Sequence, residues 1–111
     1  MRISHEYHGS TALVALAGDF IADDVENYQR SVSEHFDSGI SNIVLDVNGL
    51  ETIDSAGLET LLWTADESAA RSGRMKLVGV AGMVSEVLRV TRLARRFDLE
   101  ETVEAAARSL R

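Results

Sequence analysis

The residues best suited to chemistry lie in a short polar segment between a predicted strand and a predicted helix. Asp54 and Ser55 stand at this junction, and Gly57 follows inside the expected first turn of the helix. A serine hydroxyl there can attack an acyl group, accept a phosphate or cap the helix. Capping by Asp54 or Ser55 would contribute about 1 kcal/mol. Gly57 argues for more than a cap, because glycine costs up to about 1 kcal/mol relative to alanine at a helical position.

A serine hydrolase is the enzymatic alternative, and the residues around Ser55 disfavour it. The esterase nucleophile elbow has the pattern Gly-x-Ser-x-Gly, whereas position 53 of this chain is Ile. The three histidines, His5, His8 and His35, all precede Ser55, so the hydrolase order of serine, acid and histidine cannot occur. A hydrolase that uses Ser55 is therefore kept only as the least favoured of the three functions considered for this chain, and burst acylation would support it.

The segment before residue 40 predicts a hairpin followed by a helix. Apolar and polar residues alternate over residues 3–7, and residues 11–17 form an almost unbroken apolar run. Asp23 and Glu26 form an Asp-x-x-Glu capping pattern. Apolar residues at helical spacing then extend the predicted helix as far as Phe36.

Two strands and two helices are expected between residues 43 and 91. Residues 43–47 are β-branched and apolar, as in a buried parallel strand, and a turn through Asn48-Gly49 is expected after them. The next helix should bury one apolar stripe, and residues 75–80 and 84–91 predict a second strand and a third helix. The expected stripe consists of Leu58, Leu61, Leu62, Ala65 and Ala69.

The C-terminal segment predicts a last helix. It should begin at Asp98, with Asp98 and Glu101 repeating the acidic capping pattern and Leu99 on its buried face. Residues 94–97 could add a short edge strand. The alternation of strands and helices indicates an α/β fold, with a small mixed sheet of four to five strands covered by about four helices, as one domain over residues 1–111.

Composition excludes several classes of function. The 111 residues carry a net charge of -7, which disfavours binding to nucleic acid. Without cysteine there is neither a thiolate zinc site nor a disulfide, and no nucleotide-binding motif occurs, so we expect no metal and no cofactor. The longest apolar stretch is far shorter than a membrane span, so we expect no membrane insertion and a cytoplasmic location.

The segment around Ser55 resembles the phosphorylation motif of the STAS domains, in particular the bacterial anti-sigma factor antagonists. Residues 53–58, Ile-Asp-Ser-Ala-Gly-Leu, are similar to the family pattern Asp-Ser-x-Gly-Leu, and Gly18-Asp19-Phe20 is similar to a turn of the family. The resemblance extends over nearly the whole chain. It implies a STAS fold in which an ATP-dependent anti-sigma factor serine kinase phosphorylates Ser55 and a separate phosphatase reverses the modification. ATP and magnesium would then belong to the kinase.

Two positions depart from the family pattern. Ile21 stands where many members have an aspartate, and the acids are displaced to Asp23 and Asp24. Arg92 stands where many members have a glycine. The change at Ile21 affects the partner contacts expected of the loop after Gly18-Asp19-Phe20. The change at Arg92 affects the conformation of a local turn.

A phosphate on Ser55 would act as a charge switch. It adds about -1.5 to -2 charges, which the positive end of a helix can accommodate without unfolding. A like charge about 5 Å away from a partner carboxylate costs on the order of 3 kcal/mol, or roughly a hundredfold in affinity. We therefore expect the unphosphorylated chain to bind the anti-sigma factor and the phosphorylated chain to release it. The expected partner-binding residues are Asp19, Asp23, Asp54, Ala56, Gly57, Glu59 and Trp63.

Trp63 and the type of assembly remain open. Ser55, Glu59 and Trp63 are spaced i, i+4, i+8, on a face that adjoins the apolar stripe but is distinct from it. This places the Trp63 side chain well away from the core, as a partner anchor or as a residue packed on a neighbouring segment. The closest rival function keeps the fold but makes the chain an assembly module, such as a stressosome subunit or an accessory protein of a lipid transporter. The oligomeric state is not specified by these patterns.

Overall fold

A five-stranded mixed sheet organises the chain. The computed structural model describes residues 1–110, and its strand order is β1-β2-β3-β4-β5, which is also the order along the sequence. β1 and β2 form an antiparallel hairpin, and all later neighbours are parallel, as the α/β prediction requires. The strands are β1 (Arg2–His8), β2 (Thr11–Phe20), β3 (Asn42–Ile53), β4 (Met75–Val78) and β5 (Asp98–Glu100).

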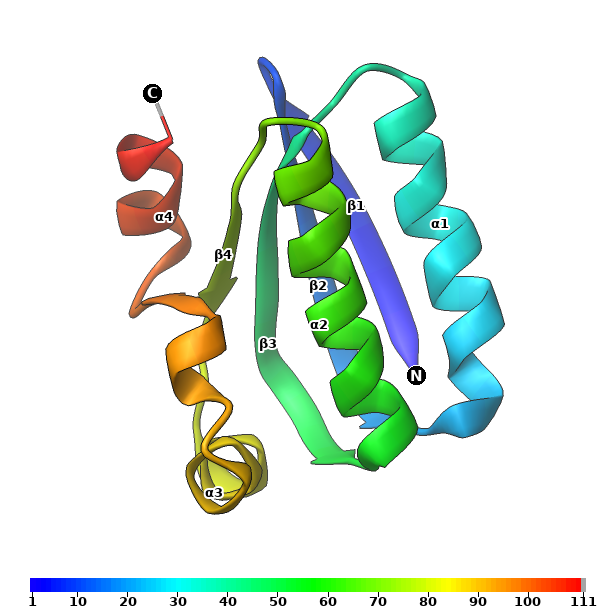
Figure 1. The fold of residues 1–111 in the computed structure, drawn as a ribbon, viewed down its shortest axis with the longest axis vertical. Coiled ribbons are helices and arrows are strands. Elements are labelled where there is room, and N and C mark those ends of the chain that lie inside the picture. The colour runs from blue at the N-terminus through cyan, green and yellow to red at the C-terminus, as the bar shows by residue number, and fades with distance from the viewer. Residues whose placement is uncertain (111) are drawn as a thin grey trace.

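Helices cover both faces of this sheet, as Figure 1 shows. α1 and α2 lie side by side across one face of β1, β2 and β3. α4 packs on the opposite face, and α3 lies beyond the end of β4. The helices are α1 (Val25–Asp37), α2 (Ser55–Ala70), α3 (Gly82–Thr91) and α4 (Val103–Ser109), with short 3-10 turns η1 (Ala22–Asp24) and η2 (Ala94–Arg96).

Strand alternation divides the apolar residues between two cores. The larger core lies between the sheet and helices α1 and α2. The smaller core lies under α4 and contains Val44, Val78 and Ala106, with Leu13 packed against them. Val44 is adjacent to Ile43 and Leu45, which face the larger core, so β3 is buried on both faces, as its β-branched composition predicts.

The predicted start of the first helix is wrong. Residues 22–24 form the turn η1, and α1 begins at Val25, so Asp23 does not cap it. Asp24 is the acid that stabilises this turn, because its Oδ2 accepts a hydrogen bond from the N–H of Ile21 at 3.2 Å.

The predicted turn at Asn48-Gly49 is wrong too. β3 continues to Ile53 beside β2. Two irregularities in the β2–β3 register accommodate the residues of β3 that have no direct partner on β2.

The C-terminal elements are displaced from their predicted positions. Residues 98–100 are the edge strand β5, and residues 94–96, expected as that strand, form η2. The last helix begins at Val103, where the side chain of Thr102 caps it by accepting a hydrogen bond from Ala105 N–H at 3.1 Å. Leu99 is consequently 44% exposed rather than buried.

The buried face of α2 is more polar than its apolar pattern indicates. Leu58 and Leu61 are buried as predicted, whereas Ala69 is exposed. Small hydroxyl residues complete this face: Thr60, Thr64 and Ser68. The hydroxyls of the two threonines bond within the molecule: Thr60 Oγ1 donates to the carbonyl of Ala56 at 2.7 Å, and Thr64 Oγ1 lies 2.7 Å from the hydroxyl of Tyr28 on α1. The buried hydroxyl of Ser68 has no partner among residues 1–110. Burial raises the pKa of Tyr28, which therefore stays protonated.

Candidate functional site

Ser55 is the first residue of α2 and is exposed to solvent. Its hydroxyl has no hydrogen-bond partner among residues 1–110, so the serine is not the helix cap. The backbone N–H groups of the first helical turn are the ones that a helix leaves unpaired. A group attached to the Ser55 oxygen would therefore lie beside the positive end of the helix.

Asp54 is the cap and also connects α2 to the loop after β2. Its Oδ1 accepts a hydrogen bond from Gly57 N–H at 2.8 Å, and its Oδ2 accepts one from Ala22 N–H at 3.0 Å. The backbone N–H of Asp54 in turn donates to the carbonyl of Phe20 at 3.1 Å. Both carboxylate oxygens are thus occupied by hydrogen bonds within the chain, and the Ser55 turn and residues 20–22 form one unit.

Gly57 is required by the close approach of two segments. A Cβ placed on Gly57 would lie 2.5 Å from the carbonyl oxygen of Phe20 and 2.9 Å from Cγ1 of Ile53. Both distances are too short for real contacts, and the first of them is to backbone, which cannot move aside easily. The unfavourable glycine in the helix is therefore explained by packing of α2 against the end of β2.

Asp19 lies near this junction, on the strand that Phe20 ends. Its Oδ1 accepts a hydrogen bond from Thr52 Oγ1 at 2.7 Å, across the β2–β3 pair. Asp19 and Thr52 pair in register, as do Phe20 and Ile53. The ends of β2 and β3 and the beginning of α2 therefore bring Asp19, Asp54 and Ser55 to the same end of the sheet.

The other predicted site residues differ in their exposure. Glu59 is exposed one turn after Ser55, Ala56 is half-buried, and Asp23 is exposed on η1. Trp63 corrects the expectation of a side chain well away from the core. It is half-buried, packs against the larger core, and its ring centroid lies 6.5 Å from that of Tyr28 in an edge contact. The packing alternative for Trp63 is the one observed.

Two further residues belong to the site. Ile21 is 40% exposed although it is apolar, and it lies between Phe20 and Ala22, both of which bond to Asp54. Thr52 is the partner of Asp19. Ile21 carried a signal in the sequence, since it departs from the family pattern. No sequence signal pointed to Thr52, because the turn predicted at Asn48-Gly49 would end the strand before this residue.

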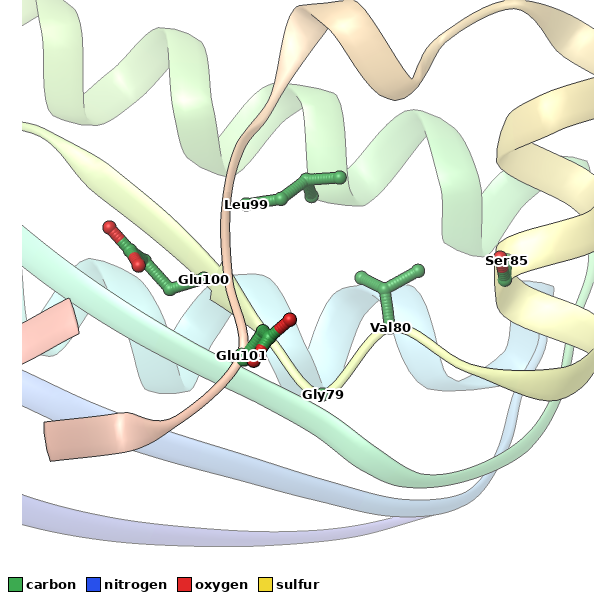
Figure 2. A pocket seen from close by; sticks show the side chains of 6 residues that line it. All are labelled: Gly79, Val80, Ser85, Leu99, Glu100 and Glu101. Carbon is green, nitrogen blue, oxygen red and sulfur yellow. The ribbon is translucent and has the colours of Figure 1, made fainter. Parts of the chain in front are cut away.

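The hollow shown in Figure 2 is separate from these residues. It has a volume of about 410 Å³, and none of the predicted site residues lines it. Its walls come from the β4–α3 turn, α3 and the β5 segment: Gly79, Val80, Ser85, Leu99, Glu100 and Glu101.

Within residues 1–110, no three His, Asp or Glu side chains are grouped so that they could hold a metal ion. No helix in that range is long and apolar enough to cross a membrane.

Several known proteins are similar to this chain in sequence or in fold. One relative, from Bordetella bronchiseptica, is named "Putative anti-sigma factor antagonist BtrV" and is 25% identical over 107 residues, covering 96% of this chain and 92% of its own. An anti-sigma factor antagonist from Mycobacterium paratuberculosis has a crystal structure with a TM-score of 0.85 at 18% identity, covering 98% of this chain and 92% of its own.

The phosphorylated form of SpoIIAA, a cell fate determinant of Bacillus, has the same fold. Its TM-score is 0.77 at 22% identity, covering 99% of this chain and all of SpoIIAA. These structural likenesses show the shared fold. The family model described as the STAS domain matches residues 2–106. The chain therefore belongs to the STAS domain family.

Proposed function

We propose that this chain is an anti-sigma factor antagonist that works as a phosphorylation switch on Ser55. The observation that carries the proposal is an exposed serine hydroxyl, without a partner in residues 1–110, at the first position of a helix that a neighbouring aspartate caps. Unphosphorylated, the chain binds an anti-sigma factor that is also a serine kinase. Phosphorylated, it is released, and a phosphatase restores it. The chain itself supplies a binding surface and no catalysis.

The local geometry suits a reversible modification that leaves the fold intact. Because Asp54 makes the cap bond and Ser55 makes none, a phosphate on Ser55 displaces no existing hydrogen bond. The unpaired N–H groups of the first helical turn can receive the phosphate oxygens. The negative charge then stands among the carboxylates of Asp19, Asp23 and Glu59, which are all exposed. Repulsion between this surface and acidic groups of a partner would cause dissociation.

Structures of two related proteins support this use of the fold. SpoIIAA has been solved in both an unphosphorylated and a phosphorylated form, each with a fold similar to that of this chain. RsbS of Moorella thermoacetica, at a TM-score of 0.82, has been solved as a serine-to-glutamate variant, a change that places negative charge at a serine. Both cases are compatible with a STAS domain whose serine receives charge without loss of the fold.

The test is phosphorylation followed by intact-mass measurement. The purified chain is incubated with ATP, magnesium and each serine kinase of the anti-sigma factor type from the source organism. We expect the wild-type chain to gain one phosphate and the Ser55→Ala variant to gain none. Ser85→Ala is the matched control, because Ser85 is also exposed near the beginning of a helix, and this variant should be phosphorylated like the wild type.

Binding to the same kinase completes the test. The Ser55→Asp variant should bind it at least tenfold more weakly than the wild type, whereas Ser55→Ala should bind it as tightly. Phosphorylation at another residue, or equal binding of Ser55→Asp and wild type, would refute the switch. Acyl transfer that depends on Ser55 would instead favour the hydrolase hypothesis.

A further inference from the structure

Among residues 1–110, no strand pairs with the outer edge of β1 in the sheet. β1 spans Arg2 to His8 and pairs only with β2, on its inner side. An unpaired edge of this length presents a row of backbone donors and acceptors to any second strand. At the opposite edge of the sheet, β5 has three residues and offers far less.

The hairpin geometry decides which backbone groups face outward. β1 and β2 are joined by the two-residue turn Gly9-Ser10, and their register is continuous from His8↔Thr11 to Arg2↔Ala17. A two-residue turn closes on a hydrogen-bonded pair, and such pairs alternate along an antiparallel ladder. His8, Glu6, Ser4 and Arg2 therefore bond to β2. The N–H and C=O groups of the residues between them, Ile3, His5 and Tyr7, point to the open edge.

Only one two-fold register of β1 with a second β1 pairs the charges of the strand. If the two-fold axis passes through Ser4, Ile3 lies opposite His5 of the second copy, and their outward backbone groups form the hydrogen-bonded pairs. Arg2 of each copy then lies opposite Glu6 of the other copy, so the two-fold axis produces two such pairs. Both are non-hydrogen-bonded pairs, in which the side chains of opposite residues lie closer together than in hydrogen-bonded pairs. A shift of the axis to His5 places two histidines opposite each other and leaves Glu6 facing Ser4. Arg2, Ser4 and Glu6 are all exposed.

We propose that a second copy of this chain binds at β1, by antiparallel β1–β1 pairing centred on Ser4. The pairing joins two five-stranded sheets into one continuous sheet and satisfies the outward groups of Ile3 and His5. It also brings Tyr7, which is 57% exposed, next to the beginning of the other β1. The strands β2 and β3 separate this edge from α2, so Ser55 stays accessible in both copies.

A single cysteine tests the centre of the register. In this arrangement the two Ser4 residues are a non-hydrogen-bonded pair with Cα atoms about 4.5 Å apart, within the range that a disulfide spans. The chain has no cysteine, so Ser4→Cys introduces one thiol per copy. With oxidised glutathione as the oxidant, which takes the two electrons, we expect a covalent dimer by non-reducing electrophoresis.

His8→Cys is the matched control, because His8 is exposed on the same strand. In the proposed register residue 8 of one copy lies about 26 Å away from residue 8 of the other, at roughly 3.3 Å per residue. We therefore expect at least tenfold less cross-linking than with Ser4→Cys. Equal cross-linking of the two variants would overturn the register.

Charge reversal tests the pairing without any cross-link. Sedimentation equilibrium should show dimers of the wild-type chain, with a dissociation constant at least tenfold higher for either Arg2→Glu or Glu6→Arg. The double variant carrying both changes restores opposite charges and should recover the wild-type dissociation constant. Circular dichroism of each variant checks that the fold is retained. A monomer at millimolar concentration, or a dimer that both single reversals leave unchanged, would overturn the proposal. Neither result affects phosphorylation of Ser55, so the two proposals fail independently.

Discussion

The hydroxyl of Ser55 and the carboxylate of Asp54 have different tasks, although the two residues are adjacent. Ser55 has no hydrogen bond to any of residues 1–110, whereas Asp54 accepts from both Gly57 and Ala22. The sequence left open which of the two caps the helix, because either residue type can do so. The second bond of Asp54, to Ala22, could not be predicted, since it depends on where the end of β2 lies.

Removal of these two side chains should therefore have unequal effects on stability. Asp54→Ala loses the cap and the bond to Ala22, and we expect the free energy of unfolding to fall by about 2 kcal/mol. Ser55→Ala should change it by less than about 0.5 kcal/mol, as exposed substitutions usually do. Urea denaturation followed by circular dichroism measures both. Equal losses would mean that Ser55 also supports the helix, contrary to the bonds described here.

At the level of elements, the ends of helices differ most from the sequence predictions. The internal stripes of α1 and α3 were predicted, because Tyr28, Val32, Val84 and Leu88 are buried as their spacing requires. Helix starts were missed where an acid resembles a cap: Asp23 lies within the 3-10 turn η1, and Asp98 is in a strand. Asp98 is instead a strand residue that pairs with the buried Lys76 at 2.5 Å. This bond is the main reason why the pKa of Asp98 lies below its usual range.

The candidate site was predicted from its motif and not from its contacts. The position of Ser55 at a strand-to-helix junction and of Gly57 in the first turn could be read locally. The packing of Trp63 could not, because its neighbour Tyr28 lies on another helix, far away in the sequence. Local patterns specify the elements, and the assembly of those elements decides which faces remain exposed.

Arg92 provides a test at the scale of one helix end. It follows α3 with a φ of 61°, and Leu93 N–H donates to the carbonyl of Leu88 at 3.0 Å, as in a Schellman motif. Glycine is preferred at this position because an L side chain is strained there. Arg92→Gly should therefore raise the free energy of unfolding by about 0.5–1 kcal/mol, and the midpoint of thermal unfolding with it.

Arg95→Gly is the control for this prediction. Arg95 is exposed in η2 and has no positive φ, so glycine there should give no gain in stability. If Arg92→Gly destabilises the chain as much as Arg95→Gly does, the left-handed conformation of Arg92 costs nothing measurable.

At the scale of the whole molecule, side-chain contacts attach the edge strand β1 to α1. His5 Nδ1 on β1 lies 2.8 Å from Nε2 of His35 on α1, and the ring of Tyr7 contacts the ring of His35. His35 is only 2% exposed, and its Nδ1 has no partner among residues 1–110. The burial of His35 could not be predicted from the sequence, since nothing in the spacing of the histidines indicates that β1 and α1 bring two of them together.

This pair should make the stability of the fold decrease as the pH falls below the ordinary histidine pKa of about 6.5. Burial and, to a lesser extent, the neighbouring His5 lower the pKa of His35, against the opposing effect of Glu34 on α1. The folded chain thus binds the His35 proton more weakly than the unfolded chain, whose histidine pKa is about 6.5. The resulting stabilisation is complete above that pH and is lost progressively as the pH falls toward the lowered pKa, by at most about 1.4 kcal/mol per pH unit.

Urea unfolding at pH 7.5 and pH 5.5 measures this dependence. The wild-type chain should lose more stability between the two pH values than His35→Gln, whose side chain does not titrate. His8→Gln is the control, because His8 is exposed and its variant should follow the wild type. The carboxylate of Asp98 does not interfere, since its pKa is below the usual acidic range and the group stays ionised throughout this interval. Equal losses in wild type and His35→Gln would show that the contact between β1 and α1 does not depend on a neutral His35.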